Sequence, residues 1–243
     1  MIYAAKVRLS IMHVNYAFLL DFARRHAPQG QTLDYGCGSG EVVRAGLAAN
    51  LDIYGCETFY EGGHGSRSGA DDLLKTQRVV EMQESIIPFA DQSFDCVVSN
   101  MVFEHVENID LALSEVHRVL KPGGVFLCLF PSIEVLREGH CGVPLAHRFS
   151  RSRFGYYWLL AFRILGFGYF TAGKTRREWA ANFQHWLNCY CFYRPEQIIF
   201  ESFARHGLEA TGIEKEYIGF RGLLLFTPWL LRRAATMVLL SSR

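Results

Sequence analysis

The sequence predicts an α/β fold in which helices cover both faces of a doubly wound, mostly parallel sheet. Short apolar runs typical of buried strands occur at 32–35, 52–56, 94–99 and 124–130, and helical stretches separate them. A glycine-rich turn follows the first of these runs directly and opens a helical pattern, as in ligand-binding strand–turn–helix units. The 243 residues, 50% hydrophobic and 20% charged, are typical of one enlarged globular domain.

Periodicity and turn residues place the outer elements. Apolar side chains recur at helical spacing over 10–26, and Gly30 helps to end this predicted helix before the first strand. Near the end of the sequence, residues 194–196 (Arg-Pro-Glu) open a helix that residues 206–208 (His-Gly-Leu) stop. The run 209–217 that follows is predicted to be a strand.

The most informative stretch is residues 34–40, which read Asp-Tyr-Gly-Cys-Gly-Ser-Gly. Glycines at this spacing let the backbone approach a ligand without a Cβ atom in the way. A turn of this kind between a strand and a helix also directs backbone N–H groups toward whatever lies above it. The alternative is a tight turn that binds nothing.

An acidic residue about 20 positions after the first glycine can accept hydrogen bonds from ribose hydroxyls. Glu57 ends a strand-like run and lies 21 residues after Gly36. An ordinary exposed glutamate at a strand end is the alternative interpretation. Gly36, Glu57 and the segment after Ser99 all fall at the carboxyl edge of the predicted sheet, where such sheets bind ligands.

The spacing Asp-x-Gly-x-Gly-x-Gly in residues 34–40 resembles motif I of the class I S-adenosylmethionine-dependent methyltransferases. Residues 87–98 are similar to the family's approach to its fourth strand, and 104–106 (Glu-His-Val) match the tripeptide that often follows it. Residues 115–124, which end Leu-Lys-Pro-Gly-Gly, resemble the helix and turn before its fifth strand. The resemblance keeps the family's order over 32–131. It implies a Rossmann-like fold with a C-terminal antiparallel strand, and S-adenosylmethionine as cofactor.

The resemblance also implies which residues bind this cofactor. They are the motif I residues, the acidic residue after the second strand, and three residues further along the chain: Asp34, Gly36, Cys37, Gly38, Gly40, Glu57, Gln83, Glu84 and Asn100. The sequence departs from the family at Gln83, where an acidic residue often contacts the adenine amino group. The side-chain oxygen of Gln83 can still accept a hydrogen bond there.

Histidines are the candidates for a general base that would remove a proton from an alcohol acceptor. His105 follows the predicted strand 94–99, which resembles the family's fourth strand, on the acceptor side in this family. His140 and His147 are rival candidates, and a helix-capping or buried structural role is the alternative for His105. The neighbouring Glu104 would orient His105 or anchor the N-terminus of the following helix.

The charges are distributed unevenly, although the net charge is only +1. The region 133–193 is predicted to be an inserted cap within a single domain, and its segment 139–177 has no Asp or Glu but carries +7 and nine aromatic residues. A tail over 219–243 is apolar and basic. It lies within an acid-free segment, 217–243, whose net charge is +4, so the remaining residues of the chain carry a net charge of −10.

Three explanations compete for this asymmetry. In the simplest, the aromatic residues form a core and the arginines a solvated face. In the second, arginines bind an anionic acceptor such as a phosphate or pyrophosphate. In the third, the tail lies on a membrane surface, because Leu223–Arg233 is apolar with an interfacial Trp229 but is interrupted by Pro228 and two arginines. Nucleic acid is a weaker fourth explanation, since no RNA-binding motif is present.

Residues 139–148 resemble a segment of bacterial methyltransferases associated with surface-polysaccharide assembly. This similarity favours O-methylation of a glycan, a glycolipid or another small-molecule acceptor, such as a lipid-linked sugar, with Arg148, Arg151 and Tyr156 as acceptor-binding candidates. The alternative is a non-catalytic partner protein that binds S-adenosylmethionine within a biosynthetic complex. A nicotinamide oxidoreductase is disfavoured by the glycine spacing.

The seven cysteines lie mostly in apolar runs and include no Cys-x-x-Cys pair, so no metal is expected. Residues 1–8 lack the apolar core of a signal peptide, and a cytoplasmic location is therefore expected. If the tail binds lipid, that location becomes the inner face of the membrane. The sequence predicts no oligomeric state.

Overall fold

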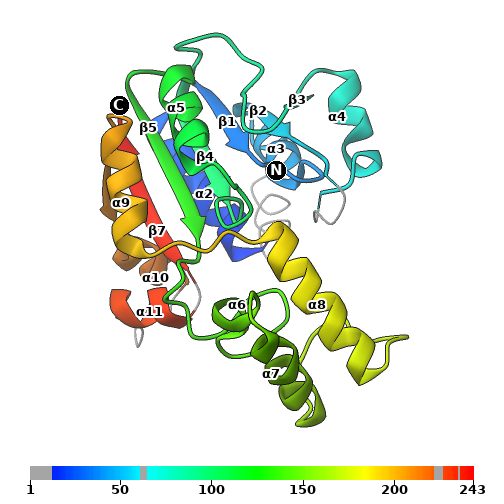
Figure 1. Ribbon diagram of the computed structural model, residues 1–243. Coiled ribbons are helices and arrows are strands. Elements are labelled where there is room, and N and C mark those ends of the chain that lie inside the picture. The colour runs from blue at the N-terminus through cyan, green and yellow to red at the C-terminus, as the bar shows by residue number, and fades with distance from the viewer. Residues whose placement is uncertain (1–12, 61–64, 222–226, 235) are drawn as a thin grey trace.

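The computed structural model describes residues 13–60, 65–221, 227–234 and 236–243. Within these residues, a seven-stranded sheet has the order β3-β2-β1-β4-β5-β7-β6 (Figure 1). Every strand runs in the same direction except β7, which is antiparallel to both of its neighbours. This architecture confirms the predicted Rossmann-like fold. The strands are β1 (Gln31–Tyr35), β2 (Asp52–Glu57), β3 (Val79–Glu81), β4 (Phe94–Asn100), β5 (Leu120–Phe130), β6 (Glu209–Gly212) and β7 (Met237–Ser242).

The strand predicted over 209–217 is shorter than expected, and it is not the antiparallel strand of the sheet. The run 209–217 is a strand only as far as Gly212, and a helix, α10 (Glu214–Arg221), begins two residues later. The buried carboxylate of Glu214 accepts hydrogen bonds from Arg232 Nε at 2.6 Å and from the Val238 amide at 3.3 Å. These contacts hold the start of α10 against the strand that is actually antiparallel, β7.

Helices pack on both faces of the sheet because side chains alternate in direction along each strand. On one face, α5 (Ile109–Val119) and α9 (Glu196–Arg205) bury an apolar cluster in which the Phe126 and Phe203 rings stack with their centroids 5.9 Å apart. On the other face, α2 (Val14–His26), α3 (Glu41–Ala48) and α10 cover side chains such as Leu127. A short 3₁₀ helix (Ser68–Ala70) and α4 (Asp71–Lys75) lie near β3.

The region 133–193 leaves the sheet after β5 and folds beyond the sheet's carboxyl edge, where Figure 1 shows its helices in green and yellow. It contains α6 (Ala146–Phe149), α7 (Arg153–Ile164) and α8 (Arg176–Tyr190), with their own apolar cluster around the fully buried Trp179. A capping box of Thr175 and Glu178 begins α8, and such caps are worth about 1 kcal/mol. The Ile133 amide donates to the Arg194 carbonyl at 2.9 Å, so both ends of the region meet.

The predicted apolar tail is largely part of the fold. Met237, Val238 and Leu239 are fully buried in β7, between β5 and β6. Arg232 and Arg233, in α11 (Pro228–Ala234), form ion pairs with Glu196, and Arg232 also pairs with Glu214. The charges of these two arginines are thus paired within the protein, and membrane binding by the tail stays a prediction. Residues 222–226, including Phe226, lie outside the described residues.

Candidate active site

A cavity of about 1060 Å³ opens at the carboxyl ends of β1, β2 and β4. Parallel sheets bind ligands at this edge, because the strand order reverses between β1 and β4 and leaves a crevice there. Of the expected cofactor-binding residues, Asp34, Gly36, Cys37, Gly38, Glu57, Glu84 and Asn100 line the cavity. The fold thus gathers side chains that are separated by up to 66 positions in the sequence.

The glycine-rich turn is held by the neighbouring strand, since the amides of Gly36 and Cys37 donate to the Cys56 carbonyl at 2.9 and 3.1 Å. A Cβ atom on Gly36 would lie 2.4 Å from Val102, and one on Gly40 would lie 2.3 Å from Leu73. Glycine is favoured at both positions because their φ angles are +74° and +84°, and Gly40 lies behind the cavity wall, at the N-terminus of α3.

Gly38 differs from Gly36 and Gly40 in the space around it. Its φ angle is +57°, and a Cβ atom there would have one heavy atom within 4 Å, the Gly65 Cα atom at 3.8 Å. The space above Gly38 therefore belongs to the cavity. Among the three glycines, this is the one at which a bound molecule can approach the backbone closely.

The carboxylate of Glu57 is fixed at the end of β2 by the backbone. Its Oε2 atom accepts from the Gly38 amide at 2.8 Å, and its Oε1 atom accepts from the Thr58 amide, also at 2.8 Å. Each carboxylate oxygen can accept more than one hydrogen bond. Glu57 can therefore accept from two adjacent hydroxyl groups in the cavity while its orientation stays fixed.

Asp34 is almost completely buried, with 2% of its surface exposed, although it lines the cavity. Burial, reinforced by the nearby charges of Glu57 and Glu41, raises the pKa of Asp34 to about 8. At neutral pH this carboxyl is therefore largely protonated. A cationic group placed beside it would favour its ionised form.

The residues around the expected adenine position are divided between two hollows. Glu84, with a φ angle of +53°, lines both the main cavity and a neighbouring hollow of about 530 Å³, whereas Gln83 lines the neighbouring hollow and not the main cavity. Asn100 lines the cavity and accepts a hydrogen bond from Asn15 Nδ2 at 2.8 Å, which ties α2 to the end of β4.

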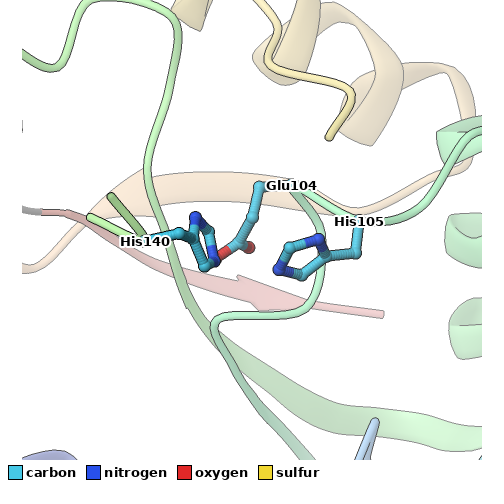
Figure 2. Close-up of side chains that lie close together, drawn as sticks. All are labelled: Glu104, His105 and His140. Atoms are coloured by element: carbon cyan, nitrogen blue, oxygen red, sulfur yellow. The ribbon is translucent and has the colours of Figure 1, made fainter. Parts of the chain in front are cut away.

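A cluster of titratable side chains adjoins one side of the cavity (Figure 2). His105 lines the cavity, and its Nδ1–H donates to the Tyr190 carbonyl at 2.6 Å, because a carbonyl oxygen only accepts. This bond places the lone pair of a neutral His105 ring on Nε2. The ring centroids of His105 and His140 are 4.9 Å apart, and Figure 2 shows the carboxyl group of Glu104 between them.

The two carboxyl groups of this cluster have opposite pKa shifts. Burial raises the pKa of Glu104 to about 7. Burial also acts to raise the pKa of Glu138, but hydrogen bonds from His140, the Cys141 amide and Tyr193 outweigh it and lower the value to about 2. The pKa of His140 is raised, since its bond to Glu138 at 2.6 Å and that ionised charge outweigh the effect of burial.

Several candidates from the sequence do not line the cavity. His147 is buried, with its Nε2–H on the Ile133 carbonyl at 2.9 Å and its ring against Tyr193. The acceptor-binding candidates Arg148, Arg151 and Tyr156 lie in the 133–193 region, where Arg148 and Arg151 are exposed and Tyr156 packs against its apolar cluster. His140 lies beside the cavity, next to His105.

Sequence reasoning missed several cavity residues. Tyr16 from α2, Tyr60 after β2, and Cys189, Tyr190 and Phe192 at the end of α8 line the cavity. The one available signal was the aromatic run at 190–193, which follows the predicted cap and precedes the next predicted helix. The sequence does not show that this aromatic run lies beside the glycine-rich turn, because that position depends on how the 133–193 region folds back toward the sheet.

Comparisons with known proteins agree with this geometry. A family model described as a methyltransferase domain matches residues 33–128. The chain is 34% identical over 114 residues to the ubiquinone/menaquinone biosynthesis C-methyltransferase UbiE of Brucella abortus (strain S19), covering 44% of this chain and 42% of that protein. UbiE of Bartonella tribocorum is 35% identical over 114 residues, covering 43% of each. The chain thus spans about two fifths of the length of these curated relatives.

Solved structures show the same fold. An S-adenosylmethionine-dependent methyltransferase from Mesorhizobium loti has a TM-score of 0.57 at 15% identity, covering 95% of this chain and 98% of that one. The geranyl diphosphate C-methyltransferase of Streptomyces coelicolor A3(2), solved with Mg²⁺, geranyl diphosphate and S-adenosyl-L-homocysteine, has a TM-score of 0.51 at 16% identity, covering 94% and 78%.

The fold and the cavity define a Rossmann-like domain with a nucleotide-type cofactor site at its carboxyl edge. The match to the methyltransferase-domain model and the motifs of the sequence analysis identify the kind of nucleotide-type site more closely. These findings support a methyltransferase domain of the class I S-adenosylmethionine-dependent kind over residues 33–128. The residues present fit this cofactor: the open backbone at Gly38 admits a close ligand, and the fixed carboxylate of Glu57 faces the same cavity.

Proposed function

We propose that this protein transfers a methyl group from S-adenosylmethionine to a hydroxyl group of a glycan, a glycolipid or another small-molecule acceptor. The observation that carries the proposal is the position of His105. It lines the same cavity as the glycine-rich turn, and its hydrogen bond to the Tyr190 carbonyl directs the basic Nε2 lone pair away from that carbonyl.

In this proposal, the sheet edge binds and orients the cofactor, whose sulfonium supplies an already activated methyl group. Gly38 admits its methionyl part, and Glu57 accepts hydrogen bonds from the ribose hydroxyls. Asp34 lies beneath the turn and balances positive charge once it is ionised. Alignment of acceptor and methyl group in such a site lowers a barrier by roughly 7–11 kcal/mol in favourable cases.

The acceptor enters from the side formed by the 133–193 region. The cavity wall there consists of Cys189, Tyr190 and Phe192, next to His105. His105 accepts the proton of the acceptor hydroxyl, a contribution typically worth about 10²–10⁴-fold in rate. The aromatic wall suits the apolar face of a sugar ring or a lipid chain.

The outer end of the same region supports a lipid-linked acceptor. Between α7 and α8, exposed apolar side chains stand beside basic ones: Leu165 is 71% exposed and Phe170 67%, and Lys174, Arg176 and Arg177 follow. We name residues 164–177 the basic–apolar tip. A basic–apolar surface of this kind binds anionic headgroups, each basic residue contributing about 1 kcal/mol. No helix among the described residues is long and apolar enough to cross a bilayer.

The function can be tested by incubating the purified protein with radiolabelled S-adenosylmethionine and lipid-linked glycan extracts, followed by mass spectrometry of the products. A mass increase of one methyl group on a sugar oxygen supports the proposal. A methylated ring carbon of a quinone would instead indicate C-methylation, as the names of the UbiE relatives describe. Cofactor binding without turnover on any extract would favour the non-catalytic partner.

A further inference from the structure

We propose that Glu104, His105 and His140 form a binding site for one divalent first-row transition-metal cation, with Zn²⁺ as the best fit. Each side chain offers one ligand atom, and these three atoms all lie within 4.8 Å of one another. Figure 2 shows the three side chains converging from two separate loops, one after β4 and one after β5. Tetrahedral zinc, with bonds of about 2.0–2.2 Å, needs ligand atoms about 3.3 Å apart, so rotations of these side chains would suffice.

The buried carboxyl group of Glu104 is the observation that points to a ligand. Glu104 is 2% exposed, and none of the described residues donates a hydrogen bond to its Oε2 atom. An unpartnered carboxyl oxygen is costly in an apolar interior. Because this group lies between two imidazole rings, a cation at the cluster would satisfy it directly.

Both histidines are also oriented as metal-binding histidines usually are. His140 Nδ1 is bonded to Glu138 Oε1 at 2.6 Å, and Glu138 is fixed in turn by Tyr193 Oη at 2.7 Å and the Cys141 amide at 2.6 Å. His105 Nδ1 donates to the Tyr190 carbonyl at 2.6 Å. Partners of this kind on the second ring nitrogen fix the ring and increase the basicity of the nitrogen that binds the metal.

Two imidazoles and one carboxylate suit zinc and its neighbours in the first transition row better than magnesium, which prefers oxygen ligands. Three protein ligands leave at least one coordination position available, as in catalytic zinc sites. Since His105 lines the main cavity, that position would be reached by an acceptor oxygen.

This inference rests on the proposed function only for the identity of that oxygen. With a cation bound, His105 is a ligand and no longer the direct proton acceptor. The positive charge lowers the pKa of the acceptor hydroxyl, and the proton passes to solvent.

The test uses the full-length protein without a histidine tag, stripped with a chelator and titrated with ZnCl₂ in a calorimeter, with MgCl₂ in parallel. We expect one tight equivalent of Zn²⁺ and no comparable binding of Mg²⁺. Glu104→Gln and His140→Ala should each weaken Zn²⁺ binding at least about tenfold. His185→Ala is the matched control, because His185 is an exposed histidine 3.7 Å from Cys189 and is the place where adventitious zinc would bind.

Substitution with Co²⁺ adds a spectroscopic test. A site of nitrogen and oxygen ligands gives visible bands without a thiolate charge-transfer band. Zn²⁺ affinity that stays at the wild-type value in Glu104→Gln and His140→Ala, or that is lost only in His185→Ala, would overturn the inference. Binding of S-adenosylmethionine measured in the same variants shows that they are folded.

The two proposals fail in different ways. Methyl transfer that survives chelation, together with no tight zinc binding, removes the metal site and leaves the proposed function intact. Tight zinc binding at these residues without methyl transfer to any acceptor keeps the metal site and removes the proposed function.

Discussion

The Gly38 amide donates a hydrogen bond to Glu57 Oε2 at 2.8 Å, so the turn after β1 and the end of β2 are directly joined. In the proposed function, the open backbone at Gly38 admits the cofactor, and the carboxylate of Glu57 faces the same cavity. The two parts of the cofactor site are thus coupled, and a change in the turn is expected to move the carboxylate as well.

Replacement of Gly38 by valine should abolish binding of S-adenosylmethionine. A side chain there occupies cavity space, and the φ angle of +57° also disfavours it. The left-handed conformation costs roughly 1–2 kcal/mol for a residue other than glycine. Gly123→Val is the matched control, because Gly123 has a φ angle of +77° and a Cβ atom added to it would meet no heavy atom within 4 Å. Calorimetry should show lost binding in the first variant and wild-type affinity in the second; equal affinities would contradict the assignment.

Binding of S-adenosylmethionine should release protons below about pH 8. Burial raises the pKa of Asp34 to about 8, so this carboxyl is protonated in the free protein at neutral pH. The cationic cofactor favours the ionised carboxylate, and its affinity should therefore rise between about pH 6 and pH 8. Calorimetry in buffers with different ionisation enthalpies measures the released proton. In Asp34→Asn the proton release should disappear, and persistent release would assign it to another group.

Substitution of His105 by alanine should lower turnover by about 10²–10⁴-fold, whether the imidazole accepts the proton itself or binds a cation. The affinity for S-adenosylmethionine should stay near the wild-type value, because cofactor contacts are assigned to Gly38 and Glu57. Single-turnover kinetics with labelled cofactor isolates the methyl-transfer step. His206→Ala removes a histidine that pairs with Asp110 at 3.0 Å, outside the cavity lining, and should leave turnover unchanged. Equal turnover in both variants would remove His105 from the reaction.

The basic–apolar tip should bind anionic vesicles. The double variant Leu165→Glu/Phe170→Glu is expected to lose co-sedimentation with phosphatidylglycerol vesicles, because it places two negative charges beside Lys174 and Arg176. Binding by the native protein should weaken as salt rises, since the screening length falls to about 8 Å at physiological ionic strength. Ile86→Glu provides the control, because Ile86 is 53% exposed but lies outside the 133–193 region. A double variant that still sediments would remove the tip as the lipid-binding surface.

Arg232 should contribute strongly to stability. Its guanidinium pairs with Glu214, whose side chain is 2% exposed, and with Glu196. In Arg232→Met the Glu214 charge is left without its main partner, a change that costs about 3–5 kcal/mol for buried pairs. Arg25→Met removes an exposed pair with Asp21 and should cost no more than about 1 kcal/mol. Urea unfolding monitored by circular dichroism compares the two variants; similar midpoints would contradict the importance of the Arg232 pairs.

The central strands could be predicted from local patterns, because the apolar run that marks each strand lies within that segment. Glycine residues also mark two short-range features, the turn of residues 34–40 and the end of the α9 helix, where Gly207 has a φ angle of +69°. The role of β7 was not predictable in this way. Residues 237–240 are apolar, and only the pairing of this segment with β5, more than 100 positions earlier, distinguishes a sheet strand from a membrane-binding segment.

In the candidate site, too, local patterns predicted some residues and not others. The sequence predicted that Gly38 and Glu57 lie at the same edge of the sheet, because both follow strands at a spacing typical of the motif. Gln83 was expected to contact the cofactor, but it lines the neighbouring hollow and not the main cavity. The proximity of His140 to Glu104 has no local signal, since 36 residues separate them and their contact depends on the path of the chain after β5.

The place of β7 between β5 and β6 has a consequence for biosynthesis. A nascent chain emerges at about 5–20 residues per second, and β5 leaves the ribosome more than 100 residues before its neighbour. During that interval the β5 edge is an unpaired row of N–H and C=O groups with apolar side chains, which is a template for pairing with other chains. Pairing of residues 237–242 with β5 therefore removes this exposed edge only at the end of synthesis of these strands.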